Sequence, residues 1–135
     1  MTPEQRIISD WLGNRPVIVP NWDKRLPDLY NEFNAEWFNN SLPPLSAEFV
    51  CEFCEMPRES AGIFIDAARA KTISTADITV RPGIRINSGL QLLSSHVKIV
   101  LLHEMVHAAG ITGHADAFAT EIERLFVSDA YTGLL

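Results

Sequence analysis

The residues best suited to chemistry form one short string, in which His103 and His107 stand four positions apart and Glu104 follows the first of them. On an α-helix each residue turns by about 100°, so two side chains four positions apart lie about 40° apart on one face. Both imidazoles can therefore offer a nitrogen to the same metal ion. Glu104 projects beside that face, where a carboxylate can take a proton from a metal-activated water.

A third histidine follows at a distance that suits the same ion. His114 comes seven residues after His107, across a segment in which Gly110 and Gly113 allow the chain to reverse tightly. Catalytic zinc sites usually have three protein ligands and one open position. We therefore expect His103, His107 and His114 to hold zinc, although an open site of three histidines also accepts manganese, cobalt or nickel.

Other candidate ligands have weaker positions in the sequence. Asp116 and Glu121 are the fallback ligands if the third histidine does not reach the metal, and Asp116 could instead orient a ligand imidazole. His96 shares the helix stripe but lies about 10 Å along the axis from the metal, which favours a cleft-wall or solvated histidine. Cys51 and Cys54 lack the second cysteine pair of a zinc knuckle, so we interpret them as free or structural thiols.

The elements that must position these residues follow an α+β order. Apolar spacing predicts helices before and after a group of short β-branched strands, with Pro82–Gly83 as a hairpin turn between the last two strands. The helix that carries the two histidines is apolar on nearly every side, which indicates a central, buried helix. The expected helices are 3–14, 26–39, 92–109 and 115–127, and the expected strands are 47–54, 62–66, 77–80 and 84–87.

Composition and charge narrow the class of protein. The chain has 135 residues, 47% of them hydrophobic and 21% charged, which predicts one globular domain over 1–135. Its net charge of −6 gives no overall field that would attract nucleic acid or an anionic membrane. The sequence contains neither a membrane-spanning run nor an apolar signal segment, so we expect a cytoplasmic protein without membrane association.

The histidine string and its surroundings resemble a known family. Residues Leu101–Ala108, followed by Gly113–Phe118, are similar to the SprT-like zinc metalloproteases, which include the Spartan proteases. That family pairs HExxH with a third histidine shortly before a phenylalanine. Upstream, Leu29–Pro43 is similar to the first core helix of the family, and Ala61–Gly62 and Ile84–Ser88 fall where the family has strands. The resemblance covers about 26–127.

The resemblance implies a minimal zincin-like domain, with a small twisted sheet packed on a central HExxH helix. It also implies that His103, His107 and His114 bind zinc and that Glu104 is the catalytic base. The sequence departs from the family pattern in having Ala115 after the third histidine and a short connection before it, closer to that of the WLM-domain proteases. It also has no counterpart of the C-terminal zinc ribbon that longer members carry.

These observations predict a zinc metalloendopeptidase that acts on a protein or peptide substrate. Two other functions stay open at this point: a metal-stabilised binding module without turnover, and a protease that acts on DNA-bound proteins. For the last, the acidic charge leaves nucleic acid binding only weak or dependent on a partner. Tyr131 and Arg85 are the candidates for stabilising the oxyanion, with no support from spacing.

Overall fold

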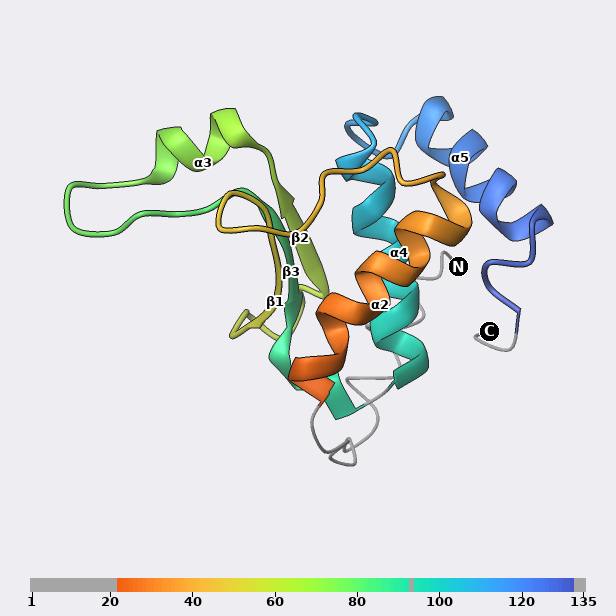
Figure 1. Cartoon of the computed structure of the whole chain (residues 1–135), viewed down its shortest axis with the longest axis horizontal. Coiled ribbons are helices and arrows are strands. Elements are labelled where there is room, and N and C mark those ends of the chain that lie inside the picture. Colours follow the sequence, from red (N-terminus) through yellow and green to blue (C-terminus); the bar gives the residue numbers. More distant parts are fainter. Residues whose placement is uncertain (1–21, 93, 133–135) are drawn as a thin grey trace.

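The computed structural model describes residues 22–92 and 94–132 and has an α+β architecture (Figure 1). The expected helix over 3–14 lies outside these residues. The elements, in chain order, are α2 (Trp22–Trp37), β1 (Val50–Cys54), β2 (Gly62–Ile65), α3 (Ala67–Ile73), β3 (Gly83–Asn87), the 3₁₀ turn η1 (Ser88–Leu92), α4 (Ser94–Ala108) and α5 (Asp116–Val127). In this part of the chain, no helix combines the length and the apolar character that crossing a membrane requires.

The three strands form one mixed sheet in the order β1-β3-β2. β3 is the central strand, parallel to β1 and antiparallel to β2, so β2 is an edge strand. Gly83 allows β3 to begin beside β1, since it has a φ of +143° and a Cβ at this position would lie 2.0 Å from the carbonyl oxygen of Val50. No other residue type fits this backbone without displacing one of the two strands.

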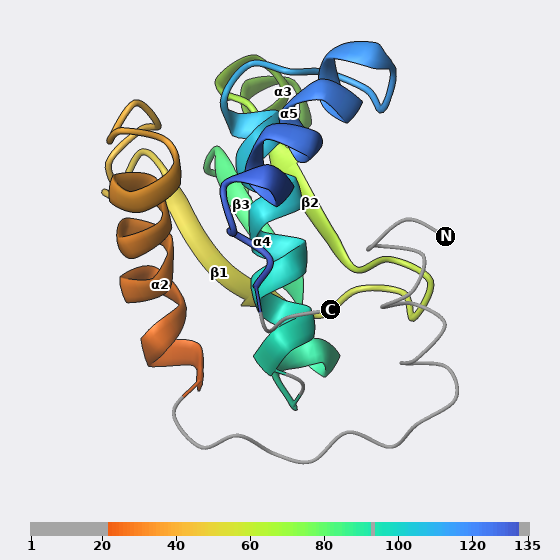
Figure 2. The same ribbon diagram turned by 90° about the vertical axis from the view of Figure 1, so that its right-hand side faces the viewer.

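The two long helices α2 and α4 cover one face of the sheet, as the two views show (Figures 1 and 2). α2 packs against β1, whereas α4 lies across β2 and β3. The side chains of α4 are buried nearly all around, among them Val97, Leu101, Leu102, Met105 and Val106. This agrees with the prediction of a central helix, and it fixes the position of every residue that α4 carries.

The segment between β2 and β3 differs from the prediction. Residues 77–80, expected as a strand, belong to a loop, and Pro82–Gly83 leads into β3 instead of forming a hairpin turn. The β-branched residues of 77–80 have no strand partner, and Ile78 is 65% exposed. β-propensity reflects packing against neighbouring strands, so without a partner it does not produce a strand.

Between β2 and β3 the chain forms α3 and then a loop that leads back to the sheet. We call this segment, residues 67–82, the arm. The arm projects away from α2 and α4 (Figure 1). The Asp66 carboxylate caps α3 by accepting a hydrogen bond from the backbone N–H of Arg69 at 2.7 Å. At the other end of α3, the Ser74 hydroxyl donates to the Ala70 carbonyl and accepts from the Val80 N–H. These local bonds give the arm a defined path.

Candidate metal centre

Three histidines converge on one point at the C-terminal end of α4. Two helical positions four apart place His103 and His107 on the same face, and the loop before α5 brings His114 back to them. The Nε2 atom of His103 lies 3.0 Å from that of His114 and 3.3 Å from that of His107, and the third separation is also 3.3 Å. Among the described residues, this is the group of side chains that could hold a metal ion.

The size of this triangle fits a small divalent cation. With zinc–nitrogen bonds of about 2.0–2.1 Å in tetrahedral geometry, two ligand nitrogens lie about 3.3–3.4 Å apart. The three observed separations match that spacing to within a few tenths of an ångström. Without a cation the nitrogens would be poorly satisfied, because three imidazoles that meet through Nε2 cannot all donate and accept among themselves.

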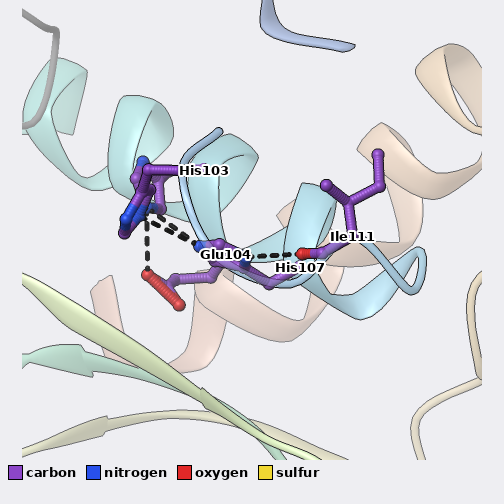
Figure 3. Close-up of polar contacts among 5 residues, drawn as sticks. His103, Glu104, His107 and Ile111 are labelled. Carbon is purple, nitrogen blue, oxygen red and sulfur yellow. Dashed lines mark hydrogen bonds and ion pairs between the residues drawn. The ribbon is translucent and has the colours of Figure 1, made fainter. Parts of the chain in front are cut away.

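The tautomer of His107 is set by the loop that follows α4. Its Nδ1 lies 2.7 Å from the carbonyl oxygen of Ile111 (Figure 3). A carbonyl only accepts, so Nδ1 carries the proton and Nε2 keeps a free lone pair directed at the other histidines. The Ile111 side chain packs against the hydrophobic core, which holds this carbonyl in place. Gly110 and Gly113 supply positive φ angles of 97° and 69° at the two bends of the loop.

An aromatic ring from α5 contacts all three imidazoles. The ring centroid of Phe118 lies 4.7 Å from that of His103, 5.0 Å from that of His107 and 4.9 Å from that of His114.

The His103 imidazole is neutral near pH 7. Burial, with smaller contributions from the two neighbouring histidines, lowers the pKa of His103 to about 3. This ring is therefore neutral near pH 7, which is the state in which an imidazole binds a metal.

Glu104 lies beside the histidines as a buried carboxyl group, with only 4% of its surface exposed. One of its oxygens is 3.8 Å from His103 Nε2 (Figure 3). Its aliphatic stem passes close to β2, since a Cβ at Gly62 would lie 3.3 Å from Glu104 Cγ and 2.7 Å from Val100 Cγ1. The absence of a side chain at Gly62 thus lets the edge strand close on α4 and confines the carboxylate next to the histidines.

The histidines and Glu104 open into a cleft of about 350 Å³. Its lining includes residues of β2, the edge strand, and the loop over 111–114. Asp66 and Arg69, at the base of the arm, complete the lining. The cleft is open to solvent, so a ligand can reach the histidines from outside.

The structure brings together His103, His107, His114 and Glu104, the four residues expected to form the site. The fallback ligands lie elsewhere: Asp116 is exposed at the start of α5, and Glu121 binds Arg124. Both lie outside the group that could hold a metal. His96 lies two turns before His103 on α4, away from the lining of the cleft.

The two candidates for oxyanion stabilisation do not reach the cleft. Tyr131 is buried against Phe126, and burial raises its pKa to about 12. The Arg85 guanidinium donates to the carbonyl of Arg81 and pairs with Glu52 on the sheet. Neither side chain lines the cleft.

The two cysteines, Cys51 and Cys54, are free thiols, as expected from the sequence.

Sequence reasoning missed the two cleft residues at the base of the arm. Asp66 is the last residue of the expected strand 62–66 and Arg69 stands three positions later, in a segment for which we predict no helix from the sequence. An acidic residue three positions before a helical residue is a signal for a helix N-terminus, and it could have located α3. It would not have shown that Arg69 lines the same cleft as the histidines, because this depends on where the arm leaves the sheet.

No protein-family model, curated protein or solved structure matches this chain. Conclusions about function therefore depend on the geometry of the site and on the motif residues quoted above.

Proposed function

We propose that this protein is a zinc-dependent metallopeptidase of the SprT-like type, with Glu104 as the general base. One observation carries the proposal: three Nε2 atoms form a triangle of cation-binding size beside a buried carboxyl group, at the bottom of an open cleft. Histidines that only served packing would not need to direct the same nitrogen at one point. A carboxyl group that only served stability would not need burial beside them.

A zinc ion held by His103, His107 and His114 would supply Lewis acidity, which lowers the pKa of a water molecule and polarises a carbonyl group. Glu104 takes the proton from the attacking water and passes it to the departing amine nitrogen, so that one water molecule is consumed for each peptide bond broken. Phe118 packs against all three rings and restricts their orientation. The Ile111 carbonyl keeps His107 in the ligating tautomer throughout.

The edge strand suits a polypeptide substrate. β2 pairs with β3 along one side only, and it lines the cleft next to Glu104. An extended peptide can add to such an edge through main-chain hydrogen bonds, which gives affinity with little dependence on sequence. The reacting carbonyl would then lie in the cleft between β2 and the histidines, within reach of the general base.

The test combines metal analysis with a cleavage assay. We expect about one zinc per chain in the parent protein and much less in His114→Ala, because two imidazoles hold zinc far less tightly than three. Glu104→Gln should keep its zinc and lose about a hundredfold to ten-thousandfold in the rate of cleavage of an unfolded casein-type substrate.

Three outcomes would contradict the proposal. Full activity of Glu104→Gln would exclude this residue as the base. Activity that resists a chelator would exclude the metal. A zinc-loaded parent that cleaves no peptide would favour a metal-stabilised binding module without turnover.

A further inference from the structure

We propose that the cleft selects acidic polypeptide segments, and that the Arg69 guanidinium binds a carboxylate of the segment that lies beside the three histidines. This inference rests on the proposed peptidase function and names its class of substrate. Arg69 is the one basic side chain other than histidine among the described residues that line the cleft. It lies on α3, which follows the edge strand β2 in the chain.

The charge of Arg69 is available to a ligand. The side chain is exposed, and none of the described carboxylates forms an ion pair with it. A carboxylate oxygen of its near neighbour Asp66 accepts a hydrogen bond from the backbone N–H of Arg69, and this bond holds the Asp66 side chain at the start of α3. The guanidinium can therefore offer its paired donors to an incoming carboxylate, the group that its planar geometry fits best.

The distribution of charge over the chain supports the same ligand. The arm holds three basic residues and one acidic residue, a net charge of +2, whereas the rest of the chain holds eight basic and sixteen acidic residues, a net charge of −8. The basic residues of the arm, Arg69, Lys71 and Arg81, are all exposed. A positive arm on an otherwise acidic protein would attract an acidic chain to the cleft and would repel it elsewhere.

An acidic polypeptide fits these features better than a nucleic acid does. The arm contains no aromatic residue on which a base could stack. Tight binding to a phosphate backbone usually needs several neutralising cations, more than three exposed residues on one short arm provide. The cleft itself also contains Glu104 and Asp66, whose negative charge disfavours the closely spaced phosphates of a nucleic acid more than a single carboxylate bound at Arg69.

The experiment measures binding, so that it does not depend on turnover. Two fluorescein-labelled peptides are compared, identical except that one carries glutamates where the other carries glutamines. Their affinity for zinc-loaded Glu104→Gln protein is measured by fluorescence anisotropy at low and at high salt. One charged contact of an exposed pair changes affinity by up to about fivefold, and reversing the charge changes it by about tenfold or more. We therefore expect the glutamate peptide to bind about fivefold more tightly at low salt, with less preference at high salt.

Variants of Arg69 identify the contact. Arg69→Gln should bring the two affinities within about twofold, and Arg69→Glu should favour a lysine-bearing peptide over the glutamate peptide. The matched control is Arg58→Glu, which makes the same change in net charge in the loop before β2, at the opposite end of that strand from Arg69. This control should keep the preference for the glutamate peptide.

The inference is overturned if no peptide binds, if Arg69→Glu keeps the preference, or if Arg58→Glu loses it equally. It is also overturned if single-stranded DNA displaces the glutamate peptide more effectively than the unlabelled peptide does. Cleavage by the parent protein separates the two proposals. Selective binding of the glutamate peptide without any cleavage would refute the peptidase function and support the recognition of acidic segments. Cleavage without this selectivity would support the peptidase function and refute the recognition of acidic segments.

Discussion

The contact between β2 and α4 at Gly62 provides the sharpest test of how the fold positions Glu104, the proposed general base. Replacing Gly62 by alanine adds one methyl group, whose carbon would lie 2.7 Å from Val100 Cγ1 and 3.2 Å from the carbonyl oxygen of Arg85. Carbon atoms in contact need about 3.5 Å, so the strand and the helix must separate by several tenths of an ångström. Alanine has no lower β-propensity than glycine, so any loss of stability comes from this contact.

The expected cost follows from the chemistry of overpacking. Extra methyl groups in a well-packed core cost about 1–3 kcal/mol, and we expect Gly62→Ala to fall in that range in urea unfolding of the metal-free protein. The same methyl group would press on Glu104 Cγ, 3.3 Å away, and displace the carboxylate from the histidines. A displacement of this kind should lower kcat about tenfold to a hundredfold, with little change in zinc content.

Val100→Ala supplies the matched background, since it removes the atom that the new methyl group meets first. The double variant should show a positive coupling: Gly62→Ala should cost at least about 1 kcal/mol less when Val100 is alanine. Because Glu104 Cγ is still crowded in that background, kcat should recover only in part. Equal costs in both backgrounds, or a single variant as stable as the parent, would refute the packing argument.

Three further predictions concern other parts of the structure. Phe118→Ala should weaken zinc binding about tenfold in a competition titration, because the ring that packs against all three imidazoles and restricts their orientation would be lost, whereas Phe126→Ala, at an exposed position on the same helix, should leave it unchanged. Gly83→Ala should cost more than about 4 kcal/mol, since a Cβ there overlaps a backbone carbonyl at a φ of +143°, and a variant with normal urea unfolding would contradict this. Burial, and to a lesser degree the charge of Glu52, raises the pKa of the Cys51 thiol from 9.0 to about 12, so the unfolded chain releases a proton above pH 9 that the folded chain retains. Stability should therefore fall by about 1 kcal/mol between pH 9 and 10, and the slope should be smaller in Cys51→Ala; equal slopes would exclude the thiol as its origin.

The site was easier to predict from the sequence than the sheet. His103 and His107 share a face because the helical period alone puts them there, and the apolar run around them already indicated a buried helix. The return of His114 followed from glycines that permit a tight bend. These are local properties of the chain, and they hold wherever the helix packs.

The arm and the order of the strands depend on contacts between distant residues. The β-branched string over 77–80 has the local character of a strand, yet β3 already pairs with β1 and β2 on its two sides and has no free edge for it. The parallel pairing of β1 with β3 likewise brings together segments that are far apart in the sequence. Arg69 could not be placed in the cleft for the same reason, since its position follows from where the arm leaves β2.

The third histidine reaches the cluster from outside the helix that carries the other two, which has a consequence for the C-terminal part of the molecule. His114 lies eleven residues after His103 and two residues before the start of α5, so a bound cation would cross-link α4 to the beginning of α5. Part of the free energy of metal binding would then stabilise the packing of α5 against α4. Chelation should loosen α5 before it disturbs the sheet, and hydrogen exchange along this helix would report the occupancy of the site.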